Sequence, residues 1–203
     1  MFEQTRRFAL PPISAAVTMF VAVMVGLHRG WVVTQLWLLA LPVLVLVWVV
    51  VIVVFAVAIG RARRFPRRWP VVVTAVFAVI GTGGPALFVA EPEVGVFTRF
   101  WLERPAFAAV AATSVPARPD DYYGSPLPSH LCLVSANCRV AVIGTSGGHP
   151  VRFVPDYVGI PDGATGYAHF RGAPGPGPYD GFGDPICPKI ELSGGWWWLG
   201  GCT

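Results

Sequence analysis

The sequence predicts a membrane α-helical protein with three transmembrane helices, followed by a small disulfide-stapled β-rich extracytoplasmic domain. Three observations lead to this fold class. The first 90 of the 203 residues contain three long uncharged apolar stretches, five arginines lie between the second and the third, and all four cysteines follow the last. Charged residues make up only 13% of the chain, whereas a soluble domain carries about 25%.

The apolar stretches cover about 11–27, 31–59 and 71–90, so residues 11–90 are predicted to form a three-span transmembrane region. A helix needs about 20 mainly apolar residues to cross the hydrocarbon core of a bilayer. Buried helices in a large soluble core are the alternative. Only Thr34 and Gln35 carry polar side chains in the long second stretch, and this favours the membrane.

The arginines predict the orientation of the spans, because short cytoplasmic loops are enriched in Lys and Arg. The loop 60–70 is therefore expected in the cytoplasm, as is the N-terminus, residues 1–10, which contains Arg6 and Arg7. Everything after Ala90 then lies outside. The arginines of the loop can also attract lipid head groups, and they are Arg61, Arg63, Arg64, Arg67 and Arg68.

Composition and charge indicate the cellular localisation of the protein. Arg outnumbers Lys fourteen to one, and Ala, Val, Gly and Pro are abundant, which is typical of a GC-rich bacterial genome. The predicted localisation is therefore the inner membrane of a bacterial cell, as a multi-pass protein. The basic residues are concentrated around the apolar half, since residues 1–90 hold eight Arg and one Glu. They indicate a membrane segment rather than a nucleic-acid surface.

The third apolar stretch contains the sequence GTGGP at residues 81–85. One interpretation is a broken helix with a binding site, as in a small transport or channel component. The other is a kink, or close packing of helices against small residues. The absence of any charged residue within the spans favours the second interpretation, because ion pathways are marked by such residues.

After the spans, residues 91–115 are predicted to form a juxtamembrane amphipathic segment, and residues 116–203 the extracytoplasmic β-rich domain. Two hairpins are expected, one over 130–144 that turns at 135–137 and one over 186–202 that turns at 193–195. Each would bring two cysteines together, which predicts the disulfides Cys132–Cys138 and Cys187–Cys202. A zinc site is the alternative, but no CxxC spacing is present. No metal and no cofactor is expected.

One motif suggests catalysis. Residues 144–148, GTSGG, match the G-x-S-x-G pattern of hydrolases, and Asp156 and His169 follow Ser146 in the order of that triad. The residues after the motif do not form a helical pattern, and the domain is small for a parallel sheet. A glycine-rich turn between two strands would have the same sequence as this motif. An envelope serine hydrolase is therefore the less favoured alternative, and a non-enzymatic role is preferred.

Aromatic residues supply the candidate interaction surface, which consists of Trp101, Trp196, Trp197 and Trp198. Tryptophan is enriched at binding hot spots. The function predicted from the sequence is therefore presentation of a β domain for binding or assembly in the cell envelope, as an accessory subunit of a membrane complex. The expected partners are the lipid bilayer and a membrane or envelope protein, and no nucleic acid.

Overall fold

The computed structural model describes residues 2–113, 122–160 and 162–202, with the side chains of residues 1–9 left undescribed. The chain forms two compact units. The first comprises Met1–Arg29 and Leu38–Gly95, and the second comprises Gly30–Trp37 and Val96–Thr203. The chain therefore passes from one unit to the other three times.

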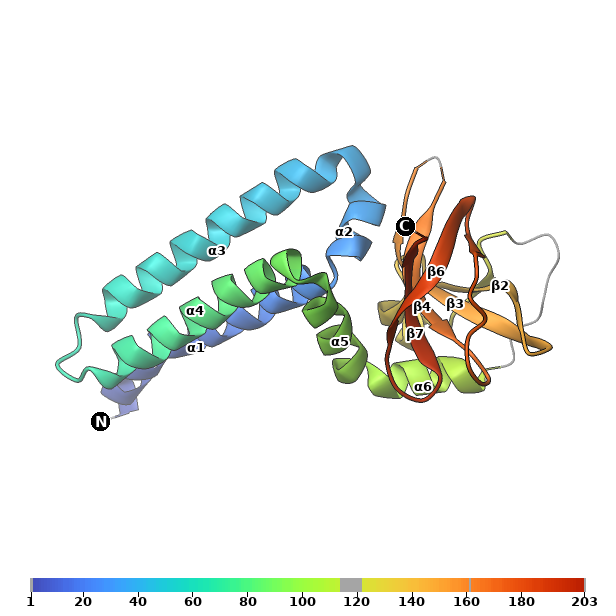
Figure 1. Cartoon of the computed structure of the whole chain (residues 1–203). Helices are drawn as coiled ribbons and strands as arrows, with labels where there is room; N and C mark the ends of the chain where they lie inside the picture. The colour runs from blue at the N-terminus through green and yellow to red at the C-terminus, as the bar shows by residue number, and fades with distance from the viewer. Residues whose placement is uncertain (1, 114–121, 161, 203) are drawn as a thin grey trace. The chain divides into compact units, whose positions relative to one another are not determined.

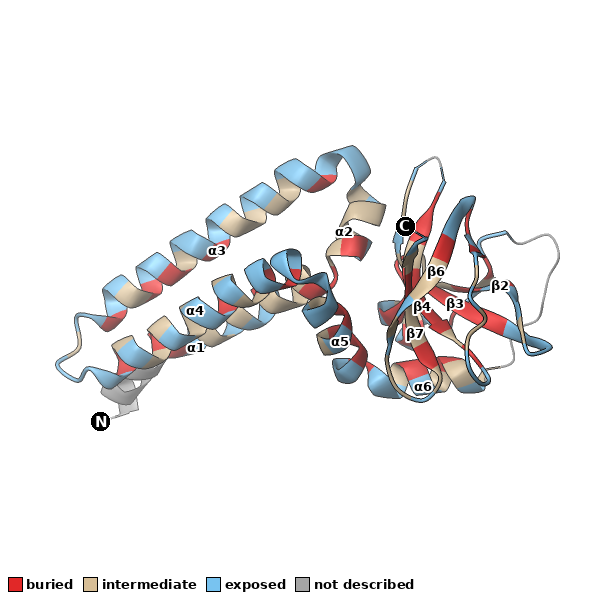
Figure 2. Cartoon of the chain, in the orientation of Figure 1, coloured by how far each residue is buried: buried red, intermediate tan, exposed pale blue. Residues whose placement is uncertain are grey.

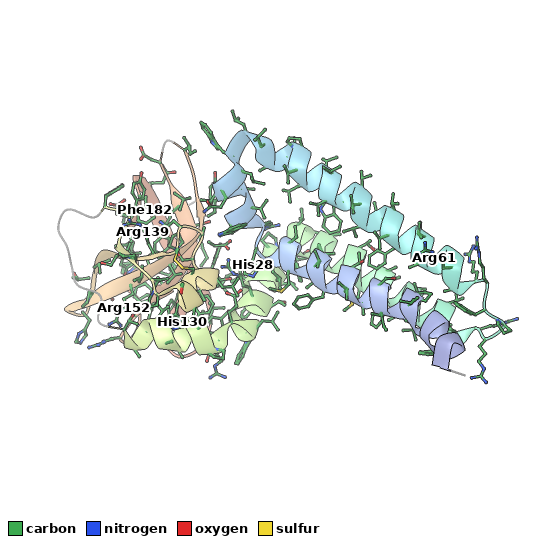
Figure 3. The ribbon with its side chains drawn as sticks, turned by 180° about the vertical axis from the view of Figure 1, so that it is seen from behind. His28, Arg61, His130, Arg139, Arg152 and Phe182 are labelled. Carbon is green, nitrogen blue, oxygen red and sulfur yellow. A yellow bond between two sulfur atoms is a disulfide. The ribbon has the colours of Figure 1, made fainter. Side chains whose placement is uncertain are left out.

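The first unit consists of three long helices, α1 (Phe2–Leu27), α3 (Ala40–Ala62) and α4 (Trp69–Ala90), shown in Figure 1. Each belongs to a segment long and apolar enough to cross a membrane. Large apolar side chains are exposed along all three, and Figure 2 shows the exposed positions of α3 and α4 in pale blue. Such extended exposure fits a lipid environment and not water. Arg61 lies in the last turn of α3, next to the loop that joins it to α4 (Figure 3).

Small residues let these helices approach one another. At Gly81 an added Cβ would lie 2.7 Å from the ring of Phe55 and 3.0 Å from Cα of Met19, and at Gly26 it would lie 2.7 Å from Cβ of Pro85. The helix α4 is continuous through the GTGGP sequence, with Pro85 inside it. The broken helix that the transport alternative requires is therefore not present, and close packing accounts for Gly81, whereas no atom lies within 4 Å of a Cβ added at Gly83.

The second apolar stretch is not one helix. Helix α2 (Arg29–Leu36) is followed by the short 3-10 helix η1 (Trp37–Leu39), and α3 begins at Ala40. Trp37 has a φ of 50°, in the left-handed region that residues with a Cβ rarely adopt. The direction of the chain therefore changes here, and Gly30–Trp37 belong to the second unit.

The second unit is a seven-stranded antiparallel sheet that curves into a half-barrel, with the strand order β1-β2-β3-β4-β7-β6-β5. Helices α5 (Pro92–Leu102) and α6 (Arg104–Ala112) precede it, and the 3-10 helix η2 (Ser129–Val134) lies between β1 and β2. The predicted fold class is confirmed. The strands are β1 (Ser125–Pro126), β2 (Arg139–Ser146), β3 (His149–Val158), β4 (Ala164–His169), β5 (Tyr179–Gly181), β6 (Asp184–Glu191) and β7 (Trp196–Gly201).

Two hydrophobic clusters are built from alternate residues of the strands. Tyr167 and Trp196 belong to the first, together with Phe100 and Phe107 of the two helices. Ala168, next to Tyr167 in β4, belongs to the second, which also contains Phe153 and Leu199. Successive side chains in a strand point to opposite faces, so both faces of the sheet are covered. The buried face of the predicted amphipathic segment, residues 91–115, thus forms part of the β-domain core.

The two disulfides join Cys132 to Cys138 and Cys187 to Cys202. The second bridges the hairpin of β6 and β7, which turns at Gly194 and Gly195, both with positive φ. The first expected hairpin is wrong in its first half, because Ser129–Val134 form a 3-10 helix and not a strand. Pro128 precedes this helix as its N-cap residue and cannot donate a hydrogen bond to a strand ladder.

Candidate functional site

Ser146 ends strand β2 and pairs with His149 across a two-residue turn. The turn is Gly147–Gly148, with φ values of 57° and 77°, which glycine adopts without steric cost. The Ser146 hydroxyl accepts a hydrogen bond from the Gly175 N–H at 3.2 Å and donates one to the Ala173 carbonyl at 3.4 Å. The motif is therefore a hairpin turn whose serine orders the loop beside it. It is not a turn from a strand into a helix.

The other two hydrolase candidates lie elsewhere in the sheet. His169 ends β4 opposite Arg152 of β3, and burial followed by the positive charge of Arg152 lowers the pKa of this imidazole. Asp156 is seven residues along β3 from His149, the partner of Ser146, which corresponds to roughly 23 Å along a strand. Asp156 also forms an ion pair with Arg99. The structure does not bring the three residues together.

The tryptophans of β7 contribute less surface than the sequence suggests. Trp196 is only 3% exposed, so its assignment to an interaction surface is wrong. It packs against Phe107 of α6 with ring centroids 5.0 Å apart. Trp198 packs on the same cluster and Trp197 on the other side of the sheet. Trp101 on α5 is different, because it is 52% exposed.

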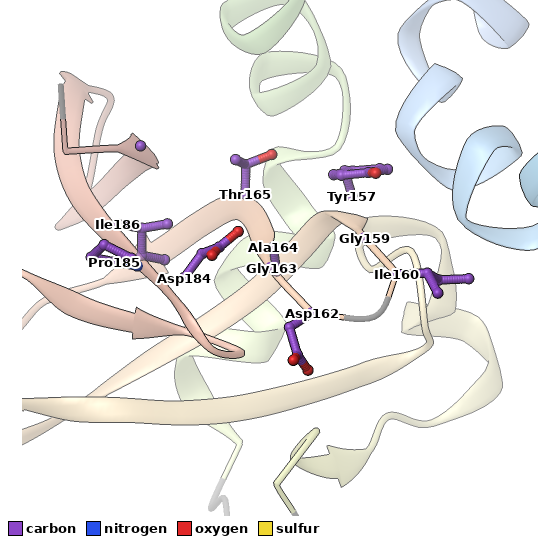
Figure 4. A pocket seen from close by; sticks show the side chains of 11 residues that line it. Tyr157, Gly159, Ile160, Asp162, Gly163, Ala164, Thr165, Asp184, Pro185 and Ile186 are labelled. Carbon is purple, nitrogen blue, oxygen red and sulfur yellow. The ribbon is translucent and has the colours of Figure 1, made fainter.

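A shallow pocket of about 220 Å³ lies between the β3–β4 loop and the start of β6 (Figure 4). Its polar lining includes Asp162, Thr165 and Asp184. In Figure 4 the two carboxylates point in different directions. The pocket is smaller than the roughly 300–1,000 Å³ typical of ligand sites. Within the described residues, no three His, Cys, Asp or Glu side chains are grouped so that they could hold a metal ion.

Two exposed tyrosines form a second feature of the domain, which we call the tyrosine surface. Tyr122 and Tyr123 are 51% and 41% exposed. Both rings contact the buried ring of Phe182, with centroids 5.7 Å and 5.2 Å away. Partial burial, and then the negative charges of Asp180, Asp162 and Asp184, raise the pKa of the Tyr122 hydroxyl. The tyrosine surface is therefore aromatic and bordered by acidic groups.

The segment Gly30–Trp37 docks on the β sheet through three contacts, which together form the α2 docking site. The Thr34 hydroxyl accepts a hydrogen bond from the Val158 N–H at 3.0 Å. The Gln35 side-chain amide donates to the Ala136 carbonyl at 2.8 Å. At Gly30 a Cβ would collide with the carbonyl oxygen of Asp156, so only glycine permits this close approach of two backbones.

A buried ionic cluster lies beside the α2 docking site. Arg99 of α5 is 2% exposed and pairs with Asp156 of β3 and Glu103. It also donates to the carbonyl oxygen of Leu133 at 3.0 Å. The Tyr167 hydroxyl donates to the carbonyl oxygen of Val96 at 3.3 Å, and burial raises the pKa of this phenol. Through Arg99, helix α5 is joined to two separate parts of the β domain.

Neither the docking site nor the ionic cluster can be predicted from the sequence alone. The one signal for the docking site is that Thr34 and Gln35 are polar residues in an apolar stretch, between Trp31 and Trp37. Arg99 gave no signal of burial, since arginine is mostly exposed in proteins. The chain was also compared with protein-family models, curated proteins and solved structures, and none of the three comparisons finds a match.

Proposed function

We propose that this protein presents its β domain outside the bacterial inner membrane for binding or assembly in the cell envelope, as an accessory subunit of a membrane complex. The α2 docking site is the observation that carries the proposal. Thr34 and Gln35 lie near the start of the second candidate span, Arg29–Ala62, and their hydrogen bonds build this segment into the β domain. A β domain that includes a segment from the span region in its own fold suits the display of a surface beside a membrane.

The tyrosine surface fits a protein partner best. Tyrosine supplies a large contact area at low cost in conformational entropy and is enriched at interface hot spots. Contacts with Phe182 hold both rings in place before any partner arrives. The neighbouring Asp162, Asp180 and Asp184 are exposed, so a partner with basic residues around an apolar centre would be complementary.

The test is extraction from native membranes in a mild detergent, followed by identification of the proteins that copurify in stoichiometric amounts. Replacement of Tyr122 and Tyr123 by Ala should abolish copurification. The matched control is Tyr157→Ala, which removes a tyrosine that is 37% exposed and lies outside the tyrosine surface. A partner retained by the double variant would contradict the assigned surface, and the absence of any partner from wild-type preparations would contradict the subunit role.

A further inference from the structure

Helix α5 is apolar on two opposite faces. Val96 and Phe100 lie on the inner face and are buried in the β-domain core. The outer face carries Val94, Phe97, Trp101 and Leu102, which are 37%, 38%, 52% and 62% exposed. A helix that packs one side on a core normally has polar residues on the other. The exposed aromatic and aliphatic side chains of α5 therefore call for an environment other than water.

The connection to α4 indicates what this environment is. Helix α4 ends at Ala90 and α5 begins at Pro92, so Glu91 alone separates them. Consecutive Cα atoms are 3.8 Å apart, so the start of α5 can lie no more than about 8 Å from the end of a candidate membrane span. A membrane span ends where the hydrocarbon core meets the lipid head groups, so the start of α5 is expected near this boundary.

The residues of the outer face have the chemistry of that boundary. Tryptophan concentrates at membrane–water interfaces because its ring is apolar and its N–H is polar. The guanidinium of Arg104 lies 4.7 Å from the centre of the Trp101 ring, which places a positive charge beside the aromatic group. Head-group phosphates would pair with this charge, while acyl chains contact Phe97 and Leu102.

We propose that the outer face of α5, together with Arg104, binds phospholipid at the outer surface of the membrane. The inner face holds the same helix to the β domain through Arg99, Phe100 and the core. One helix thus contacts lipid on one side and the β domain on the other. The occupant we assign is lipid, because the surface continues directly from a membrane span and requires no additional protein.

The experiment is quenching of tryptophan fluorescence in the full-length protein, purified alone and reconstituted in phosphatidylcholine vesicles whose acyl chains are brominated close to the head group. Trp101→Phe should lower the emission that these lipids quench. Trp197→Phe is the matched control, because Trp197 packs on the β-domain core away from α5. It should lower total emission and leave the quenched part unchanged.

A rescue variant protects the test against a general loss of structure. Adding Leu102→Trp to Trp101→Phe returns an indole to the same face of α5 and should restore the quenched emission. Equal quenched emission in the wild type and in Trp101→Phe would overturn the proposal, as would rescue failure in a variant that retains both disulfides. No partner protein is present, so the outcome is independent of the subunit role proposed above.

Discussion

The side-chain amide of Gln35 donates a hydrogen bond of 2.8 Å to the carbonyl oxygen of Ala136, which lies 101 residues further along the chain. The neighbouring Thr34 hydroxyl accepts from the N–H of Val158 at 3.0 Å. Two residues within an apolar stretch of the sequence therefore belong structurally to the β domain. These hydrogen bonds join the two segments that make up the second unit, Gly30–Trp37 and Val96–Thr203.

Thr34→Val should destabilise the β domain by about 1–3 kcal/mol, because the Val158 N–H loses its acceptor. Thermal unfolding in detergent, followed by tryptophan fluorescence, would measure the loss. The matched control is Thr18→Val, whose hydroxyl bonds only to Ser14 in its own helix, and this variant should unfold like the wild type. Equal stability of the two variants would show that the docking hydrogen bond is not formed.

Arg99→Met should destabilise the β domain more strongly, by about 3–5 kcal/mol, since it removes a buried guanidinium that pairs with the partly buried carboxylate of Asp156. Addition of Asp156→Asn should recover part of the loss, because it removes the negative charge that Arg99 no longer balances. Urea unfolding of the single and double variants measures both effects. If the double variant proved less stable than Arg99→Met, the ion pair could not be the main contribution of Arg99.

Gly81→Ala should weaken packing among the three long helices, because its Cβ would lie 2.7 Å from Phe55 and 3.0 Å from the backbone of Met19. Overpacking of this kind costs about 1–3 kcal/mol. Gly83→Ala, two residues away, has no atom within 4 Å of the new Cβ and should be tolerated. Unfolding of the two variants in mixtures with an increasing fraction of a denaturing detergent, compared by the midpoint of each transition, measures the difference. The opposite order would indicate a role for Gly83 beyond packing.

Loss of the Cys187–Cys202 disulfide in the double variant to Ala should cost about 3 kcal/mol, the value expected for a closed loop of about 15 residues. The Cys132–Cys138 bridge closes a shorter loop, with a sequence separation of 6 against 15, and its removal should cost less. Thermal unfolding of the two double variants measures this order. A larger effect at Cys132–Cys138 would show that loop closure is not the dominant contribution.

The orientation of the chain can be tested with alkaline phosphatase, which is active only outside the cytoplasm. Fusion after Thr203 should be active and fusion after Arg64 inactive, because the loop with Arg61 is expected in the cytoplasm. Replacement of the five loop arginines by Gln should reduce this contrast. An active fusion at Arg64 in the unmodified chain would reverse the proposed topology.

Much of the fold follows from local pattern. Uncharged stretches near 20 residues predict the long helices, and turn residues such as Gly194 and Gly195 predict the hairpin of β6 and β7. The alternation of side chains along a strand places Trp196 and Trp198 on one face, and both do pack on the first cluster. These features depend on residues close in the sequence, so they can be predicted without knowledge of the tertiary structure.

The sequence by itself determined that the chain has three candidate spans and a β-rich domain with two disulfides. Only the tertiary structure decided which face of α5 is covered, so that Arg99 is buried while Trp101, two residues later on the other face, is exposed. It also decided that Thr34 bonds to strand β3 and Gln35 to the turn before β2, both more than 100 residues away. The physical reason is that burial depends on which distant element covers a face, and local periodicity carries no information about that partner.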